Sequence, residues 1–233
     1  MKKRIWVIFL GLLCVVSLSG CKYMRLLQFK SQFQNFAKYF VFIKSPTKPG
    51  FRCLHPLLIP DDILLLSDGV SPSVVKTTEG VTTWAFVMKK DAAPSDIQPS
   101  VLTISLEFNA KNQLTSAFYP SQFSAIFHPD FVPQLLERMG DARVDVSSKG
   151  LEGEKAPFPE EWIPDRHKIA QHLGEPTSEI VSNNETRLSY TYTLEGASRD
   201  VNPYIMIAIS PLTQKALWVQ TTVFGFPMTM RLR

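Results

Sequence analysis

The residue types that most often carry chemistry are scarce in this chain. Its 233 residues include only 3 cysteines and 4 histidines. The sequence has no G-x-S-x-G, H-E-x-x-H or phosphate-binding glycine loop. Cys53 and His55 form a C-x-H pair without further ligands at a zinc-like spacing. His167 and His172 are five residues apart, so they do not share a helix face as residues four apart would. The sequence therefore predicts that the protein has no cofactor, binds no metal ion and is not an enzyme.

Net charge is also nearly absent once the N-terminal Lys2, Lys3 and Arg4 are set aside. The remaining 22 basic residues face 21 acidic ones, which argues against nucleic acid as a partner because such proteins need a concentrated basic face. The distribution of charge is nevertheless uneven. The segment 22–60 has no Asp or Glu and seven basic residues, Lys22, Arg25, Lys30, Lys38, Lys44, Lys48 and Arg52. It either attracts anionic lipid headgroups or forms a solvated face.

The N-terminal apolar run, Ile5 to Val16, is too short to span a membrane comfortably. It follows a positive start and precedes Leu18-Ser19-Gly20-Cys21, which is the order of a secretory signal. The last four residues resemble the lipobox of bacterial lipoproteins. The resemblance implies a signal peptide at 1–20, cleavage before Cys21, and acylation of Cys21 by fatty acids such as palmitate. The alternatives are an ordinary secretory signal with an incidental cysteine and a retained signal anchor.

The anchor also indicates a location. In lipoproteins of this type an Asp after the acylated cysteine commonly signals retention in the inner membrane, and this chain has Lys22 there. We therefore expect attachment through Cys21 to the periplasmic face of the outer membrane, made durable by buried acyl chains. Because Cys14 leaves with the signal, Cys53 has no disulfide partner in the mature chain. A lone thiol of this kind is usually buried and inert.

Residues 24–41 have the periodicity of an amphipathic helix. An apolar stripe recurs at steps of three and four, comprising Leu26, Phe29, Phe33, Phe36 and Phe40. The stripe either packs on the protein's own core or lies on a membrane surface or partner. A turn at 45–50 follows. We therefore expect residues 39–44 to form a strand before the turn and residues 51–59 to be extended after it.

Two halves of the chain share one pattern of elements. Ile-Pro-Asp at 59–61 recurs at 163–165, and each copy leads into a short apolar helix, 62–66 and 166–173. Each helix ends near a glycine and then a proline, which are typical stop signals. Three strands with a period of two follow in each half, at 81–89, 101–108 and 114–119 and at 188–194, 204–210 and 216–224. A further helix is predicted at 129–139.

These patterns predict an α+β fold. We expect two tandem units, each a helix plus a three-stranded antiparallel sheet, preceded by the N-terminal amphipathic helix. The expected organisation is a lipidated N-terminus with helix and extended segment at 21–58, a first α+β unit at 59–146, a linker at 147–162 and a second α+β unit at 163–233. One continuous sandwich is the alternative architecture.

The second half carries a family resemblance. His172-Leu173-Gly174-Glu175-Pro176, followed by Leu188-Ser189-Tyr190-Thr191-Tyr192, resembles the pattern of the small outer-membrane assembly lipoproteins, the SmpA/OmlA (BamE-like) family. It is also similar to the tandem modules of β-lactamase-inhibitor-like proteins. The resemblance covers about 50 residues and implies a fold and a mode of action, namely binding of proteins at a sheet face without catalysis. It does not transfer binding residues.

The sequence therefore favours a lipid-anchored envelope protein that is not catalytic and binds another envelope protein through exposed sheet faces. Aromatic residues on the predicted strands are the candidate binding residues, Trp84, Tyr190, Tyr192 and Trp218, although core packing explains them too. A lipid- or glycan-binding lipoprotein is the alternative. A cell-envelope hydrolase is a weaker third hypothesis, which requires His55, His128, His167 or His172 to meet carboxylates in one cleft.

Overall fold

Helices and strands run twice in the same order in this protein. The computed structural model describes residues 24–91, 100–141, 143–145, 150–152, 157–196, 202–223 and 226–233. The first run is α3 (Pro60–Leu66), β3 (Val74–Thr78), β4 (Val81–Lys90), β5 (Val101–Phe108) and β6 (Leu114–Phe118). The second run is α6 (Arg166–Leu173), β9 (Ser178–Val181), β10 (Thr186–Leu194), β11 (Tyr204–Ile209) and β12 (Ala216–Val223). The signal peptide predicted at 1–20 and the predicted lipidation site Cys21 lie outside the described residues.

Other elements flank these two runs. Before the first run come helical residues 24–33, α2 (Phe36–Tyr39), β1 (Phe40–Ile43) and β2 (Gly50–Cys53). Between the runs lie α4 (Ser121–Ile126), α5 (Phe131–Asp141), β7 (Arg143–Asp145), β8 (Gly150–Glu152) and the 3₁₀ turn η1 (Glu160–Trp162). The last strand is β13 (Phe226–Arg231).

The strands join into one sheet. Its order is β1-β2-β6-β5-β4-β10-β11-β12-β13-β8-β7, with β3 added on β4 and β9 on β10. The ladders are antiparallel apart from the contact of β13 with β8. The α+β class is thus confirmed, whereas the structure does not show two separate three-stranded sheets. The reason is that β4 extends beyond the short strand β3, and β10 extends beyond the short strand β9. The free edges of the two long strands therefore pair with each other around Lys89 and Thr193.

The junction between β4 and β10 repeats its contacts in a regular way. The Val87 N–H donates to Ser73 Oγ at 3.0 Å, and the Thr191 N–H donates to Thr177 Oγ1 at 3.2 Å. Donors and acceptors of the second bond lie 104 residues after those of the first. Ser73 and Thr177 come one residue before the short strands β3 and β9 begin. Each hydroxyl thereby satisfies an N–H of the long strand just beyond the part that pairs with the short strand.

A buried lysine ties the same junction to a helix. Lys90 is 2% exposed, and its Nζ donates to the carbonyls of Leu173 at 3.3 Å and Glu175 at 2.6 Å. These carbonyls lie at the end of α6, where a helix leaves acceptors unsatisfied and favours positive charge. Strand β4 of the first run is therefore fixed to the helix of the second.

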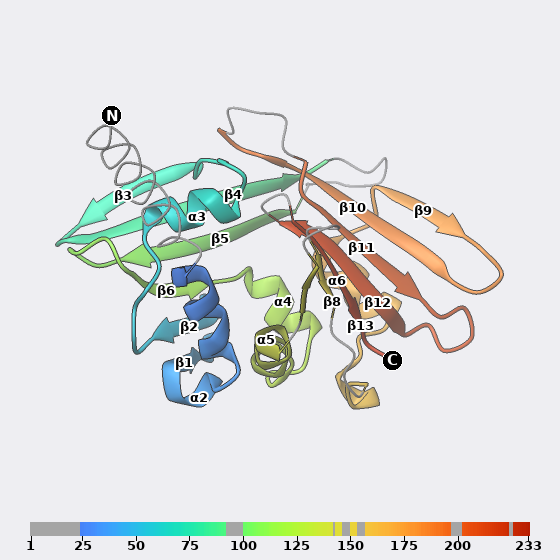
Figure 1. The fold of residues 1–233 in the computed structure, drawn as a ribbon. Coiled ribbons are helices and arrows are strands. Elements are labelled where there is room, and N and C mark those ends of the chain that lie inside the picture. The colour runs from blue at the N-terminus through green and yellow to red at the C-terminus, as the bar shows by residue number, and fades with distance from the viewer. Residues whose placement is uncertain are drawn as a thin grey trace, which may run out of the picture.

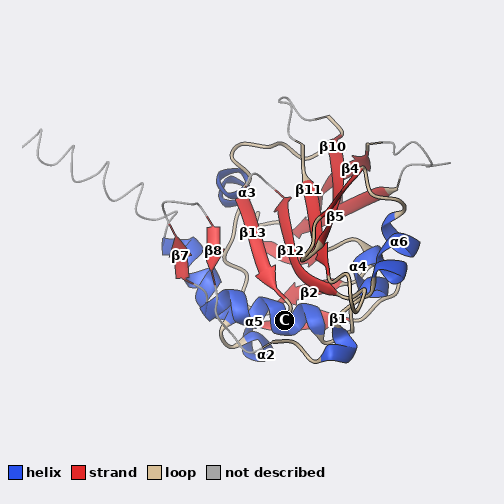
Figure 2. Ribbon diagram, turned by 90° about the vertical axis from the view of Figure 1, so that its right-hand side faces the viewer, coloured by secondary structure: helices blue, strands red, loops and turns tan. Residues whose placement is uncertain are grey.

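One hydrophobic core serves both runs. Alternate residues of the long strands point to the same side, and Phe86, Leu106, Leu188 and Ile207 belong to the cluster that also holds Ile169 of α6. Figure 1 shows α4, α5 and α6 between the two wings of the sheet, β1–β6 on the left and β10–β13 on the right. The helices cover the core face of β10–β13, and no helix of the described residues covers the opposite face of these strands (Figure 2).

The N-terminal aromatic stripe packs inward. Phe33, Phe36 and Phe40 are buried with Cys53, and Phe29 packs against them. The single helix predicted at 24–41 is divided by a turn at residues 34–35. It also ends earlier than predicted, at Tyr39, because Phe40 begins β1 and pairs with Cys53. The stripe thus forms a small second core in place of a lipid-facing surface.

Much of the basic N-terminal segment is bound to the acidic body. Arg25 forms a two-pronged pair with the fully buried Asp62, at 2.9 and 2.8 Å. Lys48 Nζ contacts Glu107 Oε1 at 2.7 Å. These charges are engaged within the protein, which weakens the prediction that the whole segment attracts lipid headgroups. In the described part of the chain, no helix combines the length and apolarity needed to cross a membrane.

Part of the predicted linker at 147–162 is regular structure. Residues 150–152 form β8, and residues 160–162 form η1. Phe158 is 4% exposed in the main core, and the Trp162 ring stacks on His128 at 4.5 Å between centroids. The described residues of this segment thus dock on the body of the protein, because Phe158 packs on Phe131 of α5 and Trp162 stacks on His128 just before that helix.

Candidate functional site

The open face of β10–β13 has a row of residues set by strand register. Arg187 pairs with Ala208, Ala208 with Trp218, and Trp218 with Arg231. Residues paired across strands share a face, so two guanidinium groups flank an indole on one side of the sheet. In Figure 2, β10 to β13 lie side by side, with the helices below and beside them.

This row borders a groove of about 390 Å³, which we call the Trp218 groove. Its lining comes from two neighbouring rows of the sheet and comprises Arg187, Met206, Trp218, Gln220, Thr229 and Arg231. Ala208 stands between the long side chains and is fully buried. It is therefore covered by its neighbours and does not itself line the groove.

The indole at the groove is fixed in place. Trp218 Nε1 donates to Glu185 Oε2 at 3.0 Å. Arg187 Nε donates to the other oxygen of Glu185 at 2.6 Å, and its guanidinium lies 5.7 Å from the indole centroid. The bond from Arg187, with a smaller contribution from Trp218, lowers the pKa of Glu185. The indole is thus oriented before any ligand arrives, which reduces the entropic cost of binding.

Arg231 completes the charge of the groove. It is exposed, and within the described residues it forms no ion pair. Glu185, the carboxylate beside the groove, is already bonded to Arg187 and Trp218. The groove therefore presents an excess of positive charge around an aromatic ring.

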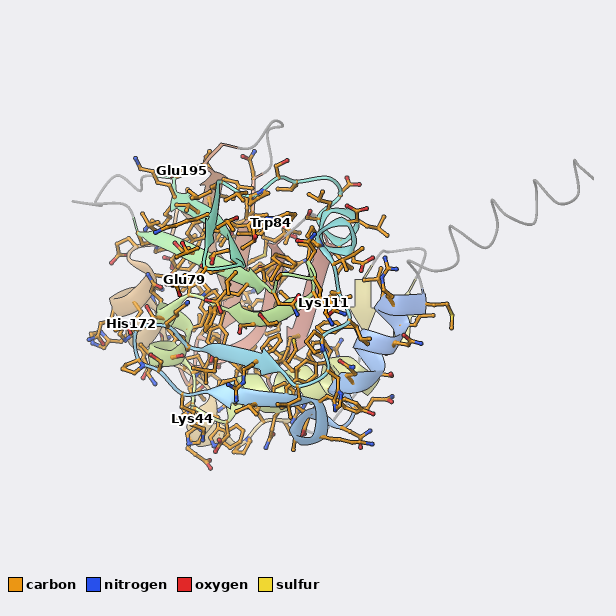
Figure 3. All side chains as sticks on the ribbon, turned by 90° about the vertical axis from the view of Figure 1, so that its left-hand side faces the viewer. Lys44, Glu79, Trp84, Lys111, His172 and Glu195 are labelled. Atoms are coloured by element: carbon orange, nitrogen blue, oxygen red, sulfur yellow. The ribbon has the colours of Figure 1, made fainter. Side chains whose placement is uncertain are left out.

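The four aromatic residues predicted to bind do not form one surface. Tyr190 and Tyr192 are 0% and 1% exposed in the core, and Trp84 packs against that core with its ring 5.2 Å from Phe108. Figure 3 shows Trp84 on the wing nearest the viewer, with β10–β13 drawn behind it. Trp218 alone of the four lies on the open face. The period of two puts Tyr190 and Tyr192 on the core side of β10, so core packing, the alternative given for these residues, accounts for both tyrosines.

Sequence reasoning missed the two arginines of the groove. Arg187 alternates with the buried Leu188, so its place on the open face could have been read from the strand pattern. Arg231 could not, because β13 was not predicted and only its register with β12 brings it beside Trp218.

The histidines lie on several elements. His128 stacks on Trp162, His55 contacts the Tyr39 ring at 5.6 Å, and His167 and His172 are on α6. Within the described ranges, no three His, Cys, Asp or Glu side chains are grouped to hold a metal ion. His167 lines one pocket together with the carboxylates Asp165 and Glu175, whereas the other three histidines do not line it. The hydrolase hypothesis therefore stays a prediction.

Cys53 lies in the N-terminal aromatic core and is 6% exposed. Burial raises the pKa of its thiol from 9.0 to about 12. Since the thiolate is the reactive form, Cys53 is poorly suited to nucleophilic chemistry.

Comparison with known proteins gives this site no precedent. No protein family matches the chain, and neither a curated protein nor a solved structure is significantly similar to it. The resemblance of residues 172–192 to the small outer-membrane assembly lipoproteins stays a prediction.

Proposed function

We propose that this protein is a lipid-anchored envelope lipoprotein that binds another envelope protein through the open face of its sheet and catalyses no reaction. The observation that carries the proposal is the Trp218 groove, in which an oriented indole lies between two guanidinium groups. Tryptophan and arginine are the residues most enriched at binding hot spots. Attachment to the outer membrane through acylated Cys21 is the part of the proposal that depends on sequence alone.

The chemistry of the groove defines the partner segment. Arg231 is available for a carboxylate, and Trp218 and Met206 offer apolar contact below it. Gln220 and Thr229 add groups that can bond to a peptide backbone. An extended acidic segment of a partner protein with an apolar side chain fits this combination, and a basic segment does not.

We also propose that the two runs of elements are tandem copies of one unit. Support comes from the spacing of 104 residues, which separates Ile59-Pro60-Asp61 from Ile163-Pro164-Asp165 and also separates the two hydroxyl contacts at the strand junction. In this interpretation each copy contributes one helix and a set of antiparallel strands. The pairing of β4 with β10 joins the strands of both copies into one sheet.

Glycan binding is the alternative at the same groove. An aromatic ring beside amide and hydroxyl groups, as Trp218 is beside Gln220 and Thr229, suits a sugar face and its hydroxyls. The two guanidinium groups favour the acidic peptide. Lipid binding by the N-terminal stripe has less support, since its phenylalanines pack in the core.

Site-specific photocrosslinking tests the proposal. A photoreactive amino acid at Thr229, in the full chain expressed with its anchor in living cells, should yield one discrete protein adduct. Arg231→Glu should reduce that adduct about tenfold or more, since the reversal places a negative charge against the acidic segment, and like charges brought together cost several kcal/mol. The matched control is Lys111→Glu, a charge reversal on the exposed turn between β5 and β6, which should leave the adduct unchanged.

The contradicting results are equally specific. An adduct that survives Arg231→Glu, or the same adduct from a probe at the 93% exposed Leu212, would place the contact elsewhere. Crosslinks to polysaccharide in place of protein would favour the glycan alternative.

A further inference from the structure

A second pocket lies on the opposite side of β10 from the Trp218 groove. It holds about 480 Å³, a size typical of small-molecule sites. Its walls are the start of α6, the segment after that helix, two core-facing residues of β10 and the turn between β11 and β12. The lining residues are Asp165, Arg166, His167, Ala170, Glu175, Pro176, Leu188, Tyr190, Thr213 and Gln214.

One wall of this pocket carries an unsatisfied polar group. Tyr190 is fully buried, and its hydroxyl has no hydrogen-bond partner among the residues that the structure describes. Burying a hydroxyl unpaired costs free energy, so native proteins rarely leave one without a reason. A phenylalanine would fill the same space without that cost. The hydroxyl is therefore the feature of the pocket that points to a ligand.

The charges around the hydroxyl define the ligand. Arg166 is engaged by Glu179 through two bonds of 2.8 and 2.7 Å, so its charge is matched. Asp165 caps α6 by accepting from the Lys168 N–H. Glu175 forms no ion pair within the described residues.

Lys90 adds a second cation near this wall, since its Nζ lies 5.9 Å from the Tyr190 ring centroid and donates to the Glu175 carbonyl. Negative charge still exceeds positive charge, because the carboxylates Asp165, Glu175 and Glu179 outnumber Arg166 and Lys90. Burial, together with the neighbouring Tyr192, Glu175 and Glu179, raises the pKa of Tyr190 against an opposing effect of Arg166, which keeps the phenol neutral. A neutral phenol oxygen accepts a hydrogen bond from a cation.

We propose that this pocket binds the primary ammonium group of a small molecule. The Tyr190 hydroxyl accepts one N–H, the Glu175 carboxylate supplies the opposing charge, and Leu188 and Pro176 contact the carbon atoms next to the nitrogen. Charge-assisted hydrogen bonds of this kind are about twice as strong as neutral ones. The site is separate from the Trp218 groove, and it does not depend on the proposed function.

Calorimetric titration of the mature chain with matched probe pairs tests the site. Glucosamine is compared with glucose, and putrescine with 1,4-butanediol, because each pair differs in its ammonium groups. Binding by both amines but neither neutral partner is expected. If only glucosamine binds, the source is an amino sugar, and if only putrescine binds, it is an alkylamine. Neutral probes that bind as well as the amines, or amines that do not bind, would overturn the proposal.

Two variants separate recognition from folding. Tyr190→Phe and Glu175→Gln should each weaken amine binding at least tenfold. Glu195→Gln is the control, a neutralised carboxylate that Figure 3 shows well apart from His172 of α6, and it should bind as the parent does.

Stability provides the second readout. Tyr190→Phe should leave the urea midpoint unchanged or raise it, because it removes an unpaired hydroxyl. A lower midpoint would show that the hydroxyl is bonded within the protein and would contradict its assignment to a ligand. Unchanged amine binding by both variants would also contradict the site.

Discussion

At the scale of single residues, the face of a strand decides what a side chain can do. Tyr190 and Trp218 are both aromatic and both lie on central strands, yet one is wholly buried and the other borders an open groove. Composition could not distinguish them. Their positions follow from alternation along β10 and from the register between β11 and β12, which fix the direction of each side chain.

Cys53 gives a prediction at this scale. Burial raises the pKa of its thiol to about 12, so the neutral thiol is favoured in the folded state. Its contribution to stability is then complete below pH 9 and is lost as the pH rises toward 12. Urea titrations of the mature chain carrying Cys21→Ser should show the free energy of unfolding falling above pH 9, by at most about 1.4 kcal/mol per pH unit from this group.

The same chain with Cys53→Ala added is the reference. It should lose that share of the slope. At pH 8 a thiol reagent should label Cys53 only after denaturant is added. Rapid labelling of the native protein would show that the N-terminal aromatic core is open.

At the scale of elements, periodicity located the long strands and helices well. The strand at 101–108 and the helix at 166–173 have the predicted bounds, because alternation or a capping Asp marks them. The strands β3 and β9 were missed, since every residue in them is exposed and no alternation results. β13 was missed for a different reason. Its place depends on pairing with β12, which no local pattern records.

Gly50 gives a prediction at this scale. A methyl group at Gly50 would lie 2.9 Å from Phe118 Cα and would also strike the Ala117 carbonyl. The backbones of β2 and β6 therefore approach too closely for any side chain at this position. We expect Gly50→Ala to lower the free energy of unfolding by about 1–3 kcal/mol, measured by urea denaturation.

Gly69→Ala is the matched control. Gly69 has a φ of +81° and no neighbouring atom within 4 Å of an added methyl. Gly69→Ala should lower the free energy of unfolding by about 1 kcal/mol, because of the backbone conformation alone. A Gly50→Ala chain as stable as the parent would mean that β2 and β6 are farther apart.

At the scale of the whole molecule, the two runs of elements act as one body. β4 pairs with β10, Lys90 of β4 holds the end of α6, and residues of both runs share one core. The sequence predicted the helix and the three longer strands of each run, but not the pairing that joins the two runs into one sheet. The short pairing between the strand ends depends on tertiary contacts. It involves residues such as Ser73 and Thr177, which resemble ordinary loop residues in the sequence.

The function proposed for the whole molecule depends on export and acylation. A Trp218 groove that faces the periplasm can meet an envelope partner, and the same groove elsewhere cannot. The anchor is also the part of the proposal that the described residues do not include, so it needs its own measurement.

Mass spectrometry of the mature N-terminus, after growth with labelled palmitate, tests this most directly. The account predicts a chain that begins at Cys21, carries the label on that residue and fractionates with the outer membrane. Cys21→Ser should remove the label. An unlabelled chain that retains Met1 and is recovered from the cytosol would contradict the account.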